Sequence, residues 1–138
     1  MRTQQGFTLI EIMVVVVIIG ILAAMIAPNI LGRADEARIT TTQSDLLSIS
    51  NALDLYRLDN LTYPTTSQGL EALVKKPGGL PEPVNWNPEG YLKKLPEDPW
   101  GRRYIYISPG SQGAFDLYSF GPDGRDGGGD DIFPGVKS

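Results

Sequence analysis

The segment from Phe7 to Ala27 is long and apolar, and it constrains the fold of this chain more than any other feature. Its 21 residues contain one charged side chain, Glu11, near their beginning. A helix rises about 1.5 Å per residue, so a helix of this length reaches about 31 Å and can cross the hydrocarbon core of a membrane. Insertion scales assign about 2.5–3.5 kcal/mol to an acid at the centre of a membrane helix, and such residues are functional candidates. The carboxylate of Glu11 therefore requires an explanation.

Two simpler interpretations of this segment leave some of its features unexplained. A cleaved secretory signal peptide has an apolar core of about 7–15 residues followed by small residues. Ala23, Ala24 and Ala27 are similar to such a cleavage site, but the apolar run is longer and only Arg2 is basic ahead of it. A plain transmembrane anchor fits the length but does not account for Glu11.

At the beginning of the chain, Gly6 directly precedes the apolar segment that starts with Phe7 and contains Glu11. This arrangement resembles the cleavage and methylation motif of type IV pilins and of the pseudopilins of type II secretion. The motif places a glycine, an aromatic residue and an acid in register with a membrane helix, here Gly6, Phe7 and Glu11. In this family a membrane-embedded prepilin peptidase cuts after the glycine and methylates the new N-terminal residue. The resemblance therefore implies cleavage between Gly6 and Phe7, N-methylation of Phe7 and a leader peptide over residues 1–6. It also implies that residues 7–29 form a transmembrane and polymerisation helix.

The resemblance gives Glu11 a role in assembly. Cleavage creates a positive amine on Phe7, and a carboxylate five residues into the mature chain can pair with the amine of a neighbouring subunit. Pairing lowers the cost of burying a charge, and fixing register is the best-attested use of buried polar groups. We therefore predict that Glu11 aligns each incoming subunit in a homopolymer.

The composition excludes several functions. The chain has 138 residues, a net charge of −4, no cysteine and no histidine. Thiol catalysis, zinc sites built from Cys and His, and triads that use His are thereby excluded. The acidic balance argues against a nucleic-acid partner. A membrane-anchored enzyme that uses paired carboxylates is a further alternative, but no two acids can be assigned to a cleft, and we predict that the chain is not an enzyme.

Beyond Pro28 the sequence predicts a helix that continues to about residue 60. Proline can bend or end a helix, so an anchor helix that stops at Pro28 is an alternative, but residues 34–38 are mostly good helix formers. Apolar residues then recur at steps of three and four, which predicts a face packed on a sheet. This stripe consists of Leu46, Ile49, Leu53 and Tyr56, widened by Leu47, Leu55 and Leu58.

The remaining residues predict a loop-rich domain with a small sheet. A short second helix follows Gln68, with Thr66 or Ser67 as its cap, and the proline-rich segment 75–99 is a loop. Three large side chains in that loop are expected to pin it to the core: Trp86, Tyr91 and Leu95. Residues 98–101 form a tight turn, and residues 104–107 and 115–120 form an antiparallel hairpin. We therefore predict an α+β fold in which a long N-terminal helix packs on a small antiparallel β-sheet, as in type IV pilins.

The second half of the chain contains several short motifs: Leu58-Asp59-Asn60, Tyr63-Pro64-Thr65, Gln68 to Leu73, Gly90-Tyr91-Leu92, Asp98 to Gly101 and Asp116 to Ser119. Together they resemble the major pseudopilin of type II secretion, the general secretion pathway protein G family. The resemblance implies a single-pass inner-membrane protein whose residues 30–138 form a periplasmic domain. It implies a filament subunit that drives export of folded proteins across the outer membrane. The implied partners are other copies of the chain, minor pseudopilins, the inner-membrane assembly platform and the prepilin peptidase, with the membrane itself before assembly and no nucleic acid. The alternative is a type IV pilin for adhesion, motility or DNA uptake, although such pilins usually carry a C-terminal disulfide and this chain has no cysteine.

The C-terminal segment 121–131 contains five glycines and four acids in eleven residues. Composition alone leaves two alternatives, a flexible acidic tail and a calcium loop, because Ca²⁺ takes six to eight oxygen ligands. The spacing does not fit an EF-hand. The resemblance implies a Ca²⁺ site, whose ligands by position are the carboxylates of Asp123, Asp130 and Asp131 and the backbone carbonyl of Phe120, with Ser119 and Asp126 as further candidates.

Overall fold

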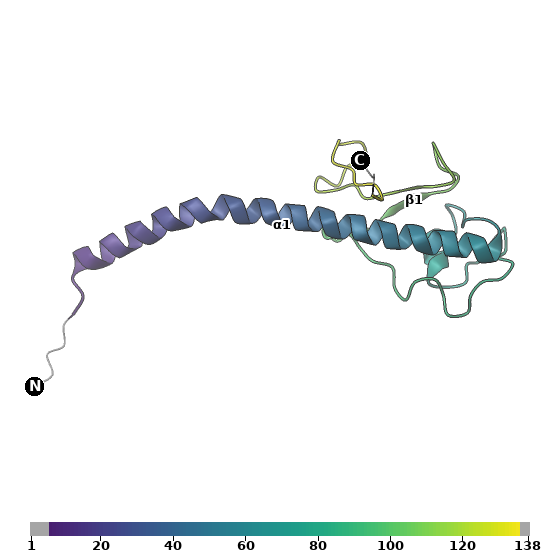
Figure 1. Ribbon diagram of the computed structural model, residues 1–138, viewed down its shortest axis with the longest axis horizontal. Helices are drawn as coiled ribbons and strands as arrows, with labels where there is room; N and C mark the ends of the chain where they lie inside the picture. Colours follow the sequence, from purple (N-terminus) through teal and green to yellow (C-terminus); the bar gives the residue numbers. More distant parts are fainter. Residues whose placement is uncertain (1–5, 136–138) are drawn as a thin grey trace, which may run out of the picture. The chain divides into compact units, whose positions relative to one another are not determined.

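One long helix, one short helix and a two-stranded sheet form the regular structure of the described part of the chain (Figure 1). The computed structural model describes residues 6–135, and within residues 27–31 it describes the backbone alone. Helix α1 spans Leu9–Asn60, the 3-10 helix η1 spans Leu70–Leu73, and the strands are β1, Ile105–Ile107, and β2, Asp116–Tyr118. The chain divides into two compact units, Met1–Ala37 and Arg38–Ser138. Because α1 continues past Pro28, the alternative in which the helix stops there is wrong.

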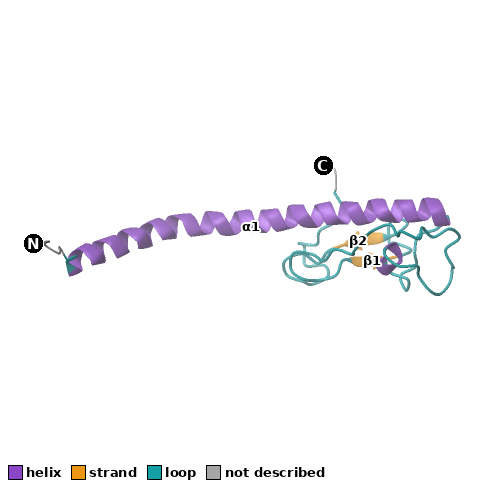
Figure 2. Cartoon of the chain, turned by 90° about the horizontal axis from the view of Figure 1, so that it is seen from below, coloured by secondary structure: helices purple, strands orange, loops and turns teal. Residues whose placement is uncertain are grey.

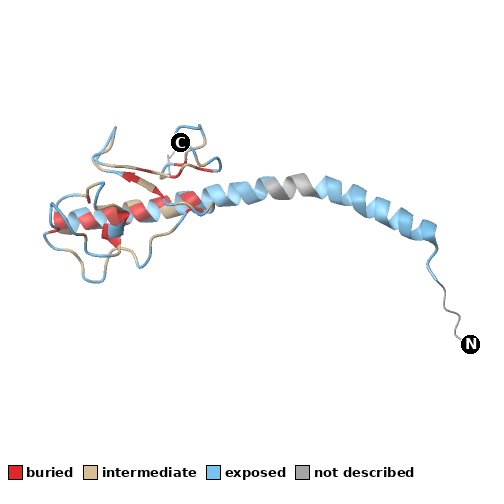
Figure 3. Ribbon diagram, turned by 180° about the vertical axis from the view of Figure 1, so that it is seen from behind, coloured by how far each residue is buried: buried red, intermediate tan, exposed pale blue. Residues whose placement is uncertain are grey.

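The core of the second unit lies between the end of α1 and the sheet (Figure 2). The predicted stripe is confirmed, since Leu46, Ile49 and Leu53 are fully buried and Tyr56 is 2% exposed. Ala52 of α1 and side chains from η1, the sheet and the loops complete this core: Leu70, Ala72, Leu73, Tyr104, Tyr106, Leu117 and Ile132. Figure 3 shows that the buried residues of α1 gather in its C-terminal part. The apolar side chains at the start of α1 are not part of this core.

Three leucines that the pattern assigned to the stripe are exposed instead. The exposed fractions of Leu47, Leu55 and Leu58 are 54%, 54% and 75%. Adjacent residues are separated by about 100° around a helix of 3.6 residues per turn. Because α1 contacts the domain along a narrow face, residues beside the stripe lie outside the contact. The same face begins one turn earlier than predicted, at Thr42, which is fully buried. Its hydroxyl donates to the carbonyl of Arg38 at 2.9 Å.

The hairpin is antiparallel as predicted, but both of its strands are shorter than predicted. Ile105 lies opposite Tyr118, and Tyr106 lies opposite Leu117. Strand β1 ends before Pro109, which has no backbone N–H to donate. Ser119, which directly follows β2, exchanges both of its backbone hydrogen bonds with Ile132, each at 2.9 Å. The chain therefore returns beside β2 after the C-terminal loop, and this pairing closes the loop at its base.

The predicted cap of the second helix is wrong. Gly69 occupies the N-cap position of η1, without a side-chain capping bond. The hydroxyl of Thr66 instead accepts from the backbone N of Ser108 at 2.8 Å and donates to its carbonyl at 3.0 Å. Thr66 thus ties the loop before η1 to the hairpin.

The proline-rich loop is fixed to the core, as predicted. The indole Nε1 of Trp86 donates to the carbonyl of Ala72 at 2.8 Å. The hydroxyl of Tyr91 donates to Asp59 Oδ2 at 2.9 Å, and Leu95 packs against the core cluster. These contacts hold the segment between η1 and β1 against the domain.

Candidate functional site

The first part of α1 presents apolar side chains on every side. Each described side chain from Gly6 to Ile26 is exposed. Leu9–Ile26 has a mean hydropathy of 3.0 and is long and apolar enough to cross a membrane. Length and composition alone do not separate an anchor from a signal sequence. A helix that is apolar all round is stable when lipid or other apolar helices surround it.

Glu11 closes the first turn of α1 in a reciprocal capping box. Thr8 donates to Glu11 Oε2 from its backbone N at 2.9 Å and from its hydroxyl at 3.0 Å. The backbone N of Glu11 donates in return to the Thr8 hydroxyl at 3.4 Å. The Thr-x-x-Glu spacing is the sequence signal for this motif, and an argument from membrane burial alone misses it. The carboxylate is therefore already held beside the backbone nitrogen that follows Phe7.

The predicted cleavage site lies ahead of α1. Gly6 and Phe7 are outside regular structure, and the side chain of Phe7 is 84% exposed. Proteases act preferentially on exposed segments of this kind. Residues 1–5 of the predicted leader lie outside the described residues.

The C-terminal loop brings two of its acids together. The backbone N of Asp123 donates to Asp130 Oδ2 at 3.1 Å. A Cβ added to Gly128 would collide with Asp123 Oδ2 and lie 2.9 Å from Asp130 Oδ1. Both carboxylates therefore converge on the bare Cα of Gly128, where any larger residue would displace them. Asp131 approaches from the next position, and its Oδ2 accepts from the backbone N of Gly127 at 3.0 Å.

Two carboxylate oxygens of this loop are shielded from solvent without a hydrogen-bond partner among the described residues. They are Asp130 Oδ1 and Asp131 Oδ1. An unpartnered buried polar atom costs about 1–3 kcal/mol, and more when it is charged, and a hard cation would satisfy both oxygens. Within residues 6–135, no three acidic side chains gather closely enough to hold a metal ion. Backbone oxygens would therefore have to complete a coordination shell.

The two further candidates, Ser119 and Asp126, point elsewhere. The hydroxyl of Ser119 donates to Asp98 Oδ2 at 2.9 Å. Asp126 Oδ1 accepts from the hydroxyl of Tyr118 at 3.3 Å. The ring of Phe120 packs edge-on against Tyr118, with 5.9 Å between centroids. Asp123, Asp130 and Asp131 thus remain the side chains best placed to face a cation.

Two buried tyrosines fix the sheet to the rest of the domain. The hydroxyl of Tyr104 donates to Asp45 Oδ2 at 2.8 Å, and that of Tyr106 donates to the carbonyl of Pro64 at 2.7 Å. Burial raises the pKa of Tyr106 to about 12. Burial is also the largest cause of the raised pKa of Tyr104, followed by its hydrogen bond to Asp45. Both hydroxyls therefore stay protonated and donate at neutral pH.

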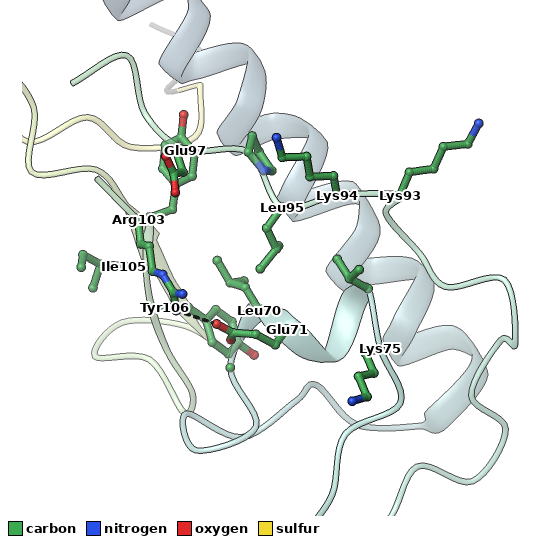
Figure 4. Close-up of a pocket in the computed structure, with 14 residues that line it drawn as sticks. Leu70, Glu71, Lys75, Lys93, Lys94, Leu95, Glu97, Arg103, Ile105 and Tyr106 are labelled. Carbon is green, nitrogen blue, oxygen red and sulfur yellow. Dashed lines mark hydrogen bonds and ion pairs between the residues drawn. The ribbon is translucent and has the colours of Figure 1, made fainter. Parts of the chain in front are cut away.

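A groove of about 730 Å³ runs between η1, the segment before the turn at residue 98, and β1 (Figure 4). Its lining includes two acids, Glu71 and Glu97, and four basic residues, Lys75, Lys93, Lys94 and Arg103. Arg103 Nη1 pairs with Glu71 Oε1 at 2.9 Å across it. The charge of Arg103 is thus directed at η1.

These features define a class of protein. The N-terminal apolar helix, the small antiparallel sheet packed on its far end and the glycine-aromatic-acid motif are those of a type IV pilin-like subunit. Residues 1–27 match the prokaryotic N-terminal methylation motif. Residues 29–133 match the family described as type II secretion system (T2SS), protein G. The chain belongs to this type II secretion system protein G family.

Individual relatives agree with this assignment. The chain is 62% identical over 129 residues to type II secretion system core protein G of Pseudomonas aeruginosa, and the alignment covers 94% of this chain and 91% of that relative. The corresponding values for core protein G of Escherichia coli K12 are 54%, 94% and 89%. The fold is similar to the crystal structure of the major pseudopilin from the type 2 secretion system of enterohaemorrhagic Escherichia coli, with a TM-score of 0.69 and 48% identity. That match covers 74% of this chain and 86% of the other. The predicted fold class and family are confirmed.

Proposed function

We propose that this chain is the major subunit of a type II secretion pseudopilus, a periplasmic filament that drives export of folded proteins across the outer membrane. One observation carries the proposal within this family. Apart from Glu11, the side chains of Leu9–Ile26 are apolar, and they are exposed on all sides of the helix. Such a helix resides in lipid before assembly and among the same helices of other copies afterwards. The chain itself acts as a structural element and catalyses no reaction.

The remaining partners and the location follow from this role. Before assembly the chain is a single-pass inner-membrane protein with its domain in the periplasm. The prepilin peptidase cuts between Gly6 and Phe7 and methylates Phe7. The inner-membrane assembly platform and the minor pseudopilins then contact the chain, and nucleic acid does not. A type IV pilin for adhesion, motility or DNA uptake is the alternative, and the protein G family match favours the secretion role.

Processing gives a direct test of this function. Co-expressed with a prepilin peptidase in a bacterium that lacks its own major pseudopilin, the wild-type chain should be cut, restore secretion and form filaments. Gly6→Leu should remain uncut, because the bulky side chain obstructs cleavage, and should abolish both activities. Mass spectrometry of the N-terminus, electron microscopy and assay of a secreted protein measure these results. Normal filaments and secretion from uncut Gly6→Leu would contradict the proposal.

We also propose that the C-terminal loop binds one Ca²⁺ ion. Asp123, Asp130 and Asp131 would hold it together with the backbone carbonyl of Phe120, and the loop would have to tighten on binding, because the three carboxylates do not meet around one position in this structure. The convergence of Asp123 and Asp130, and the two unpartnered oxygens of Asp130 and Asp131, support this proposal. The ion would neutralise like charges that otherwise repel, and it would tie the two ends of the loop together.

Removing calcium should therefore destabilise the domain. A ligand at 100 times its dissociation constant adds about 2.7 kcal/mol to the free energy of unfolding. For a domain of this size that amounts to a rise in Tm on the order of 10 °C. We expect EDTA to lower the Tm of the full chain in detergent by this order and calcium to restore it, as measured by circular dichroism.

Two variants in the same loop make this test specific. Asp130→Asn should abolish the calcium-dependent shift in Tm, because Asp130 supplies one of the two converging carboxylates. Asp126→Asn removes the same charge but faces Tyr118, so the shift should persist. If neither EDTA nor calcium changed the Tm of the wild type, the proposed calcium site would be refuted.

A further inference from the structure

Arg102 joins the turn before β1 to the C-terminal loop. Its Nη1 donates to the carbonyl oxygen of Gly121 at 2.7 Å, and charge-assisted hydrogen bonds of this kind are among the stronger ones. A Cβ added to Gly124 would lie 2.6 Å from Nη2 and 2.7 Å from Nη1 of the same guanidinium. One side chain thus contacts both ends of the turn 121–124. Both glycines have positive φ, 68° and 67°, a conformation that other residues rarely adopt.

The carboxylate of Asp98 accepts hydrogen bonds both from Arg102 and from Ser119, which follows β2. Asp98 is only 4% exposed, and its Oδ1 accepts from the backbone N of Arg102 at 2.8 Å. Its Oδ2 accepts from the hydroxyl of Ser119 at 2.9 Å, and that hydroxyl accepts from the backbone N of Gly121 at 3.1 Å. These bonds form a closed ring through Asp98, Arg102, Gly121 and Ser119. The start of the loop is therefore fixed from outside the loop.

The turn that Arg102 supports packs directly on one of the converging acids. A Cβ on Gly121 would collide with the carbonyl oxygen of Asp130 and lie 3.3 Å from Asp130 Oδ2. Asp123, in the same turn, donates its backbone N–H to that Oδ2 atom. The position of the turn thus determines how closely the carboxylates of Asp123 and Asp130 approach each other.

We infer that Arg102 is a positioning residue of the C-terminal loop, which holds the turn 121–124 so that Asp123 meets Asp130 before a cation arrives. This inference rests on the proposed calcium site. Arg102 would then support calcium binding through the position of the turn, although its positive charge alone would repel Ca²⁺. Replacing Arg102 therefore separates the two effects by sign, because loss of a repelling charge tightens binding and loss of a positioning contact weakens it.

Calorimetric titration of the full chain in detergent with calcium chloride measures that sign. We expect Arg102→Ala to weaken binding by about tenfold, the scale set by one charge-assisted hydrogen bond. Arg103→Ala is the matched control, since it removes the same charge from the next position, where the side chain pairs with Glu71 (Figure 4). Its affinity should stay within about twofold of the wild type. Arg102→Lys keeps the charge without the planar fork, and it should restore only part of the affinity. Unchanged or tighter binding by Arg102→Ala would overturn the inference.

Amide hydrogen exchange without calcium separates positioning from a general loss of stability. In Arg102→Ala the amides of Asp123 and Gly127 should exchange faster, while those of α1 between residues 46 and 56 keep the wild-type rate. Equal acceleration in both regions would mean that the substitution only destabilises the domain, and this too would overturn the inference. If the wild type binds no calcium, the proposed site fails, whereas the exchange rates still decide whether Arg102 orders the loop.

Discussion

Replacing Glu11 by alanine is expected to abolish filament assembly while the chain is still inserted in the membrane and cut after Gly6. On the proposed function, Glu11 pairs with the amine of Phe7 in a neighbouring subunit, inside a bundle of apolar helices. Without the carboxylate, that amine is left unpaired in an environment that does not solvate it, and such a loss is strongly unfavourable. Filament yield should fall by about tenfold or more, as counted by electron microscopy at equal expression.

Glu11→Gln is the matched variant, because Glu11 also caps its own helix. A glutamine can serve in the same capping box with Thr8, but it carries no charge. Assembly should therefore fail in Glu11→Gln as it does in Glu11→Ala. Wild-type filament yield from the glutamine variant would show that Glu11 acts through the cap, and it would exclude the pairing.

Leu53→Ala is expected to destabilise the domain strongly, whereas Leu58→Ala leaves its stability nearly unchanged. Leu53 is fully buried in the core between α1 and the sheet, but Leu58 is 75% exposed. Truncating a buried leucine costs about 2–5 kcal/mol, while most surface substitutions stay within about 0.5 kcal/mol. Denaturant unfolding of the full chain in detergent, followed by near-ultraviolet circular dichroism, measures both values.

The two variants form a matched pair, because both leucines belong to the same apolar pattern and both substitutions remove the same atoms. The two variants also have nearly equal helix propensity at the changed site. A similar loss of stability in the two variants would contradict the assignment of the core face of α1. A large effect of Leu58→Ala on filament yield alone would instead place Leu58 in a contact between subunits.

The family and fold class could be predicted because local patterns carry them. Gly6, Phe7 and Glu11 stand in fixed register with an apolar segment, and Leu46, Ile49 and Leu53 recur at helical spacing. The width of the buried face could not be predicted, since it depends on how much of α1 the sheet covers. The residues beside the stripe are leucines whether or not the sheet covers them, so residue type alone does not show which of them are buried.

Contacts between distant residues were also beyond the sequence pattern. Ser119 pairs with Ile132 only because the C-terminal loop folds back. The sequence predicts a tight turn that includes Asp98, but the hydrogen bond between Asp98 and Ser119 spans 21 residues. The acids of the loop could be named from the sequence only as candidate metal ligands. The sequence could not show that Asp123 and Asp130 converge while Asp126 faces outward, because this difference depends on how the loop folds.

The most direct test of the assembly mechanism is a reconstruction of the filament at side-chain resolution. We expect the N-terminal helices to pack together in the centre, with the carboxylate of Glu11 within about 4 Å of the Phe7 amine of a neighbouring subunit. A filament in which subunits touch only through their periplasmic domains, with Glu11 bonded to its own Thr8 and no neighbouring amine, would contradict the mechanism.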